Sequence, residues 1–366
     1  MMRRKTRFVC VSDTHGYTPS ETGFRLPAGD VLIHAGDLTN QGSKSELRKT
    51  MDWIVAADYE VKIVICGNHD TTLDSRFYAQ KGAKLHNKSP QDPQGCKEIL
   101  TNASPSIVFL EHQSALVRLR KPNGPNTVFK VFGSPYSQCN GDWAFLYEPD
   151  EAEKLWNQIP LDADIVVTHM PPRLHCDKIA GAAVGCWDLR RRLERVRPCL
   201  AVCGHIHESR GYERVRWGSA EASEGENKGE CEDEGVEDQV AKGDLPPQGS
   251  KKQSLVDLTG KRAPRLNNHG FSKASASFPP FETQDVVILP PLRPRIDHEQ
   301  TRGFSQSFPT EFQAHDTEAE HLQAQRRETC IVNAAIMATN WPHRGGRKFH
   351  GPIIVDLELP VWTESS

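Results

Sequence analysis

The sequence predicts an α/β fold in which mixed β-sheets are covered by helices. Two patterns support this class: short β-branched runs recur through the first half of the chain, and amphipathic helical patterns lie between them. Strands that alternate with helices are typical of α/β cores. At 366 residues, the chain is long enough for one large domain or two ordinary ones.

Four apolar runs are predicted to be buried strands. They are Phe8–Val11, Val31–Ala35, Lys62–Cys66 and Ile165–Thr168. The stretch 107–132 also has strand composition, and its Pro-Asn-Gly-Pro turn at 122–125 predicts an antiparallel hairpin. We therefore expect both parallel and antiparallel pairing.

Two helices are predicted from apolar residues at helical spacing. The first begins with Ser43 and Glu46, which form a capping box. The second runs from Cys186 to Val196 and stops before Pro198, with Arg190–Arg192 on a solvated outer face. The buried faces consist of Leu47, Met51, Ile54 and Val55 in the first helix and Leu189, Leu193 and Val196 in the second.

The composition changes between residues 219 and 326. Residues 221–238 are acidic and Gly-rich, and Pro, Ser, Gln and Lys dominate the remainder of this segment, so we expect a disordered insertion that could contact a protein partner. The apolar run Val286–Leu289, followed by two prolines, is interpreted as collapsed linker rather than a docking strand. Strands resume at Cys330–Met337 and Ile353–Leu359, which predicts one discontinuous domain, 1–218 with 327–366.

Composition excludes several classes of protein. A net charge of −3 and a pI near 6.6 give no strong nucleic-acid signal. The ten cysteines show no CxxC spacing, and the apolar run after the basic N-terminus is too short for a signal sequence. No segment is long enough to span a membrane. We expect a cytoplasmic protein, with the nucleus as the alternative.

Five short motifs follow predicted strands in order, where α/β folds bind ligands. Their carboxylate, amide and imidazole groups suit two divalent ions that share one carboxylate, with manganese as first choice and iron, zinc or magnesium as alternatives. Asp37 is the expected bridge between the two ions. The motifs are Asp13-Thr14-His15, Gly36-Asp37, Gly67-Asn68-His69-Asp70, Thr168-His169 and Gly204-His205-Ile206-His207.

The chemistry expected from two adjacent cations is hydrolysis of a phosphate ester. They lower the pKa of a bridging water towards about 7, so that a bridging hydroxide can attack while the phosphoryl charge is neutralised. The leaving oxygen needs a proton, which His69 can supply, and Asp70 is placed to orient the His69 ring.

The motifs DxH, GD, GNHD, a lone His and GHxH resemble those of the calcineurin-like metallophosphoesterases, a family with a four-layer α-β-β-α sandwich. Further motifs at 133–136, 142–145, 168–172 and 204–208 resemble the branch of metallophosphoesterase-domain-containing proteins, here with a fungal-like insertion. The resemblance implies two metal sites. Asp13, His15, Asp37 and His207 would hold one ion, and Asp37, Asn68, His169 and His205 the other.

The substrate expected is a small-molecule phosphoester. Protein phosphatases of the superfamily carry GDxVDRG and GNHE with an arginine that grips the phosphate, whereas this chain has Gly-Asp-Leu-Thr-Asn-Gln-Gly at 36–42 and Asp70. Losing that arginine penalises a dianionic monoester more than a diester, so a phosphodiester, such as a cyclic nucleotide, is favoured. A phosphomonoesterase or protein phosphatase is the first alternative, and a scaffold that only binds partners is the second. The side chains of Asp142, Trp143 and Phe145 either line the substrate site or pack a loop on the core.

Overall fold

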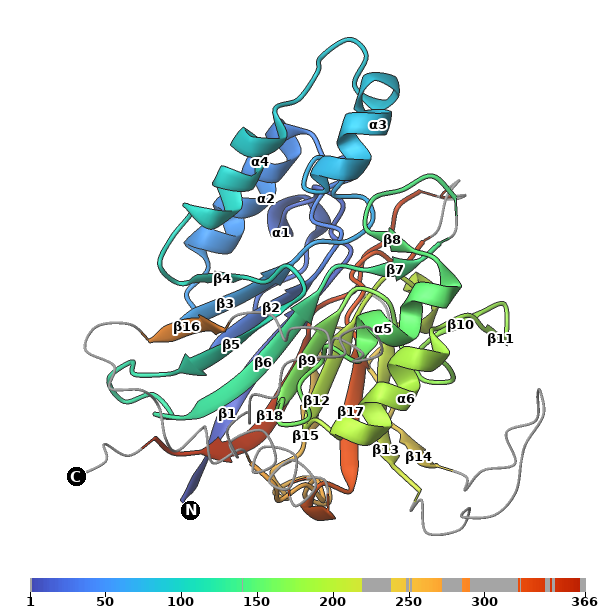
Figure 1. Cartoon of the computed structure of the whole chain (residues 1–366). Coiled ribbons are helices and arrows are strands. Elements are labelled where there is room, and N and C mark those ends of the chain that lie inside the picture. The colour runs from blue at the N-terminus through green and yellow to red at the C-terminus, as the bar shows by residue number, and fades with distance from the viewer. Residues whose placement is uncertain are drawn as a thin grey trace, which may run out of the picture.

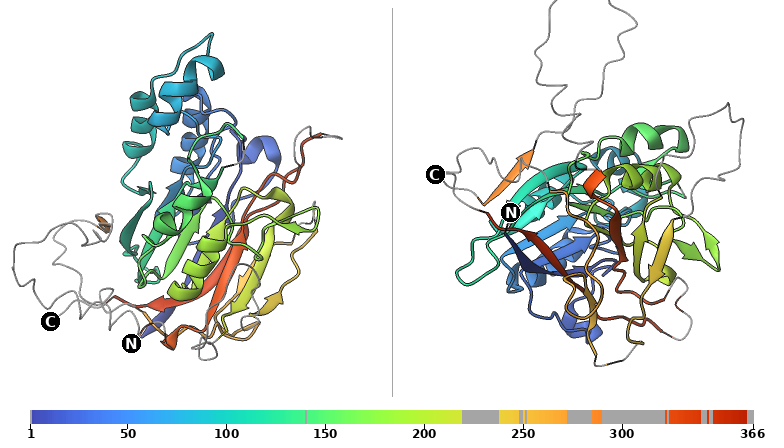
Figure 2. Two further views of the ribbon diagram at one scale, coloured as in Figure 1. Left: turned by 45° about the vertical axis from the view of Figure 1, so that its right-hand side comes forward. Right: turned by 90° about the horizontal axis from the view of Figure 1, so that it is seen from below.

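Two β-sheets pack face to face between two layers of helices (Figures 1 and 2). The computed structural model describes residues 2–139, 141–218, 238–247, 250, 252–271, 285–289, 322, 324–339, 343 and 346–362. The predicted α/β class and the four-layer sandwich are confirmed.

In the described part of the chain, the first sheet has six strands, and its central pairs are parallel. β1 pairs with β2, β2 with β3 and β3 with β4 in parallel, whereas β18 lies antiparallel to β1 and parallel to β15. In spatial order the strands are β15 (Ser254–Asp257), β18 (Ile353–Pro360), β1 (Arg3–Val11), β2 (Val31–Ala35), β3 (Val61–Ile65) and β4 (Ile107–Phe109).

The second sheet has eight strands and contains the predicted hairpin, β5 with β6. Strands β6, β9, β12 and β17 are parallel to one another, and the outer pairs are antiparallel. In spatial order they are β14 (Gln239–Lys242), β13 (Gly211–Arg216), β17 (Glu328–Asn333), β12 (Leu200–Cys203), β9 (Ile165–Thr168), β6 (Val128–Ser134), β5 (Gln113–Arg118) and β16 (Val286–Leu289). Two short ribbons join β7 (Ser137–Gln138) to β8 (Leu146–Tyr147) and β10 (Lys178–Ile179) to β11 (Ala182–Ala183).

Helices cover the outer face of each sheet (Figure 1). The first sheet is covered by α1 (Pro19–Thr22), α2 (Lys44–Ala56), α3 (Ser75–Leu85) and α4 (Pro93–Thr101), and the second by α5 (Ala152–Trp156) and α6 (Trp187–Val196). Short 3₁₀ turns occupy Pro149–Glu151 and His207–Ser209. Among the described residues, no helix combines the length and apolar character needed to cross a bilayer.

Both predicted helices are present, with one correction on the second. The Ser43–Glu46 capping box starts α2 as expected. On α6 the apolar face is buried, but Arg192 is buried too and donates to the Ile159 carbonyl at 2.9 Å. The outer-face prediction is therefore wrong for Arg192, because its long side chain reaches back to cap a neighbouring loop.

The main core lies between the two sheets, and side-chain alternation builds it. Phe8 and Cys10 of β1 point into this core, whereas Val9 and Val11 face the helices. Because both faces of the central strands are covered, these strands appear in the sequence as continuous apolar runs.

The prediction of disorder across 219–326 is wrong for three stretches. β14 extends the second sheet beyond β13, β15 pairs with β18, and β16 pairs with β5. Val256 and Leu266 are buried in the main core, so the folded unit includes part of the insertion. The linker interpretation of Val286–Leu289 is also wrong, since a free sheet edge accepts a short apolar segment. Within 219–326, the residues outside the described part of the chain are 219–237, 248–249, 251, 272–284, 290–321 and 323.

A buried arginine anchors the C-terminal end of this insertion. Arg326 is fully buried, and it donates to Asp164 Oδ1 at 2.7 Å and to the carbonyls of Gly270 at 2.8 Å and Ala163 at 2.6 Å. Burial raises the pKa of Asp164 to about 6, although Arg326 opposes that shift. The guanidinium therefore joins the insertion to the loop before β9.

We expect Arg326→Met to lower the free energy of unfolding by about 3–5 kcal/mol, because Asp164 loses its buried counter-charge. Urea denaturation followed by tryptophan fluorescence measures this loss. Arg327→Met removes an exposed arginine next in sequence and is the control. A loss below about 1 kcal/mol for Arg326→Met would show that Asp164 is satisfied without it.

Candidate metal centre

The predicted motifs meet at one edge, where the parallel strands of both sheets end. β1, β2 and β3 lead into the loops of Asp13, Asp37 and Asn68, and β9 and β12 lead into those of His169 and His205. Hydrogen bonds join these loops across the two sheets. The His205 amide donates to the Asp13 carboxylate at 3.0 Å, and His169 Nδ1 donates to the Ala35 carbonyl at 2.9 Å.

Four of the predicted ligand residues adopt left-handed backbone conformations. The φ angles are 56° at Asp13, 45° at His15, 53° at Asp37 and 66° at His205. Such angles cost a non-glycine residue on the order of 1–3 kcal/mol. Backbone bonds hold them: the Asp13 amide donates to the Gly36 carbonyl and the His15 amide to the Asp37 carbonyl, each at 3.0 Å.

Two glycines leave room for the acidic side chains. A Cβ at Gly67 would lie 2.3 Å from Asp37 Oδ1, and one at Gly204 would lie 2.3 Å from Asp13 Oδ2. No larger residue fits at either position without moving a carboxylate. The chain therefore keeps space around both oxygens.

The potential ligand atoms fall into three overlapping groups in which all atoms lie within 4.8 Å of one another. Asp13, His15 and Asp37 each belong to two of the groups. The groups are Asp13, His15 and His207; His15, Asp37 and His69; and Asp13, Asp37 and His169.

The distances support a cation among these residues. His15 Nε2 and His207 Nε2 face each other at 3.4 Å, and His169 Nε2 lies 3.3 Å from Asp37 Oδ1. Burial lowers the pKa of His15 to about 3, which leaves its ring neutral with a lone pair to donate. The donor set of carboxylate oxygens and imidazole nitrogens fits a divalent cation.

Two predicted ligands remain to be placed, because these groups consist of carboxylates and imidazoles and His205 is not among their members. Asn68 Oδ1 lies 3.1 Å from His169 Nε2, so its amide is inside the centre. The His205 ring packs against the His169 ring with centroids 5.0 Å apart, but it enters none of the three groups. Ligation by His205, as by the other predicted ligands, stays a prediction.

His69 lies beside the centre, and its ring is held from two directions. Its Nδ1 donates to the Asn40 carbonyl at 2.8 Å, and its backbone amide donates to Asp37 Oδ1 at 2.9 Å. The Trp143 ring covers it, with centroids 4.1 Å apart and an interplanar angle of 33°. This contact favours the site interpretation of Trp143, whereas Phe145 is buried in the core.

The sequence contained no signal for the role of Asn40, because its backbone carbonyl, and not its side chain, accepts the hydrogen bond from His69.

The expectation that Asp70 orients the His69 ring is wrong. The Asp70 carboxylate is fully buried and accepts hydrogen bonds from the Leu38, Thr39 and Gly67 amides and from the Thr39 hydroxyl, at 2.8–3.2 Å. The Asp70 carboxylate therefore accepts from these four donors and not from the imidazole of His69. Asp70 therefore ties the loop of Asp37 to the loop of Asn68.

Residues 6–209 match the family model described as calcineurin-like phosphoesterase. A probable rhamnogalacturonate lyase C of Emericella nidulans is 41% identical over 223 residues, which cover 59% of this chain and 19% of that protein. Human metallophosphoesterase domain-containing protein 1 is 38% identical over 221 residues, covering 56% and 62%. A UPF0046 protein of Caenorhabditis elegans is 30% identical over 205 residues, covering 56% and 64%. The chain spans less than two thirds of the length of these relatives.

We expect Asp70→Ala to lower the free energy of unfolding by at least about 2 kcal/mol, because four buried donors lose their acceptor. Thermal and urea denaturation measure this, with the exposed Asp58→Ala as control. If Asp70 acted only on the His69 ring, stability would stay at the wild-type level and only the pH profile of activity would move.

We expect Gly67→Ala to weaken manganese binding by about 10- to 100-fold, because its Cβ displaces the Asp37 carboxylate. Equilibrium dialysis with metal analysis measures the affinity. Gly211→Ala is the matched control, since a Cβ there meets only the Ser209 carbonyl oxygen at 3.9 Å. Equal affinity in both variants would show that Asp37 Oδ1 is not a ligand.

Proposed function

Because the chain belongs to the calcineurin-like phosphoesterase family, we propose that it is a hydrolase that cleaves a small-molecule phosphodiester at a two-metal centre. The observation that carries the proposal is the overlap of the ligand groups: Asp37, like Asp13 and His15, belongs to two of them, and it joins a group with His15 to a group with His169. One carboxylate common to two groups is the arrangement that two adjacent cations require. The activity of the whole protein is part of this proposal.

Asp13, His15, Asp37, His169 and His207 would hold the divalent cations, which would supply an activated water nucleophile and neutralise charge on the phosphoryl oxygens. The chain itself supplies orientation and a proton. Asp13 and Asp37 are held by amide donors from His205 and His69, so both carboxylates keep fixed directions. Manganese is our first choice for the metal, with iron, zinc and magnesium as alternatives, because the donors are oxygen and imidazole nitrogen.

His69 is the proposed proton donor to the leaving oxygen. A carbonyl only accepts, so the bond to Asn40 places a hydrogen on Nδ1 and leaves Nε2 to exchange the catalytic proton. Trp143 shields one face of the ring from water. His69 is also near enough to His15 and Asp37 to be counted with them, so its variant must be tested for metal content as well as for rate.

A phosphodiester is favoured over a monoester because the segment 36–42 has no arginine to clamp a dianionic phosphate. A diester presents one negative charge fewer to the centre. Phosphomonoester hydrolysis is the alternative, and parallel assays of both ester types separate the two.

We expect Asp37→Ala to abolish metal-dependent cleavage of bis(4-nitrophenyl) phosphate and to lower the bound metal from two ions per chain. His69→Ala should keep both ions while kcat on a diester with an alkoxide leaving group falls by about 10²- to 10⁴-fold, because only proton transfer is lost. The fall on the 4-nitrophenyl ester should be smaller, because 4-nitrophenolate leaves with little need of a proton. Assays with manganese, magnesium or zinc, repeated with 4-nitrophenyl phosphate, measure the rates, and metal analysis gives the stoichiometry.

His269→Ala removes an exposed histidine outside the centre and serves as the control. Loss of metal in His69→Ala would make His69 a ligand instead of a proton donor. Two ions bound without turnover of either ester would contradict the hydrolase proposal and favour the scaffold.

A further inference from the structure

A cavity of about 340 Å³ adjoins the metal centre on the side of His15. Tyr17, Asn40, Lys49 and Arg347 also line it. Asn40 is the residue whose carbonyl holds His69, so the cavity opens directly beside the proposed proton donor. A group attached to a phosphorus atom at the metal centre would enter this space.

Arg347 is the cation in this cavity that lacks a carboxylate partner within the described part of the chain. Lys49 Nζ lies 2.7 Å from Glu21 Oε1. The carboxylate of Glu46, which also lines the cavity, is taken up by the amides of Ser43 at 3.0 Å and Asn40 at 3.1 Å. A guanidinium without a counter-charge attracts an anionic group.

The Arg347 side chain is positioned by an aromatic pair. Its guanidinium carbon lies 5.4 Å from the centroid of the Tyr17 ring, and that ring packs against Phe349 with centroids 5.1 Å apart. The backbone beside it is tied down, since the His350 amide donates to the Ile336 carbonyl at 2.7 Å and the Ala338 amide to the Lys348 carbonyl at 2.8 Å. Arg347 is therefore exposed but restrained in position.

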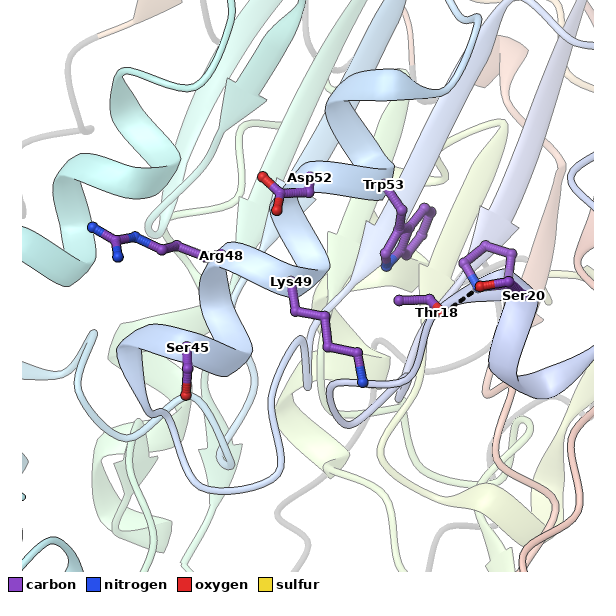
Figure 3. A pocket seen from close by; sticks show the side chains of 8 residues that line it. Thr18, Ser20, Ser45, Arg48, Lys49, Asp52 and Trp53 are labelled. Atoms are coloured by element: carbon purple, nitrogen blue, oxygen red, sulfur yellow. Dashed lines mark hydrogen bonds between the residues drawn. The ribbon is translucent and has the colours of Figure 1, made fainter.

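The space continues along α2, away from the metal centre. A second, more open cavity of about 680 Å³ is lined by Thr18, Arg48 and Trp53, and it shares Lys49 with the first. Figure 3 shows Lys49 and Trp53 projecting from α2 on the side of Thr18. The second cavity is lined by none of the predicted metal ligands. We therefore interpret it as the outer part of a groove that starts at His15.

We propose that Arg347 is a specificity residue that binds a second anionic group, carried on the organic arm of the phosphodiester in the cavity beside His15. This inference rests on the proposed function. The planar guanidinium can form paired, charge-assisted hydrogen bonds with a phosphate or carboxylate on that arm. Arg347 lies on a loop far in sequence from 36–42, so it selects the arm instead of clamping the scissile phosphate.

The role of Arg347 is tested with two substrates that differ by one phosphate. They are the 4-nitrophenyl ester of thymidine 5′-phosphate and the same ester bearing a 3′-phosphate. We expect the wild type, loaded with manganese, to prefer the 3′-phosphorylated ester through a lower KM. Arg347→Ala should reduce that preference about 10-fold, the effect of losing a charge-assisted hydrogen bond, and Arg347→Lys should restore part of it. Lys348→Ala removes the neighbouring exposed cation and should keep the wild-type preference.

Binding gives a readout that does not depend on turnover. Calorimetric titration of the manganese-loaded protein compares thymidine 3′,5′-bisphosphate with thymidine 5′-monophosphate. The inference is supported if the wild type binds the bisphosphate more tightly than the monophosphate and Arg347→Ala loses this difference while its metal content is unchanged. This result supports the inference even if no ester is cleaved. In that case only the proposed function fails. Equal binding of both nucleotides by the wild type, or an equal loss of preference in Lys348→Ala, would overturn the role of Arg347.

Discussion

The structure depends on the junction where the carboxyl ends of its two sheets meet. The Asp13 carboxylate, on the first sheet, accepts from the His205 amide of the second, and His169 Nδ1 reaches back to the Ala35 carbonyl. Buried carboxylates are tolerated only when donors or cations surround them. The same requirement that joins the sheets therefore concentrates oxygen and nitrogen ligands in one place. The packing of the two sheets and the clustering of the candidate metal ligands therefore meet the same requirement, which is to surround buried carboxylates with donors or cations.

Conformational strain at this junction is balanced by hydrogen bonds outside the ligand set. The left-handed backbone at Asp13, His15 and Asp37 persists because neighbouring amides and carbonyls fix it. Asp70 does the same for two loops at once, which explains why an acidic residue follows His69 although it does not touch the imidazole ring. The positions of the candidate ligands are therefore fixed partly by residues outside the ligand set.

The sequence was sufficient to predict the strands that lead into the centre and the ligand motifs at their ends, because both are local patterns. Val31–Ala35 and Ile165–Thr168 have the predicted bounds. What it could not predict depends on partners distant in the chain. β15 contains only two aliphatic residues, and it is a strand because β18 offers an open edge. Arg326 would be expected in solvent until Asp164 is placed beside it. Arg347 lines the cavity beside His15, where it lies over the Tyr17 ring.

The position of β18 also has a consequence for biosynthesis. β18 lies between β1 and β15, so the first sheet stays divided until residues 353–360 have left the ribosome. Until then β1 exposes an unpaired edge, and the apolar faces of Phe8 and Cys10 lack part of their cover. The pairing of β1 with β18 joins segments that lie far apart in the sequence, and such pairing is slow. The nascent chain must therefore remain protected from aggregation until β18 has been synthesised, and a chaperone that binds exposed strand edges would meet it first at β1.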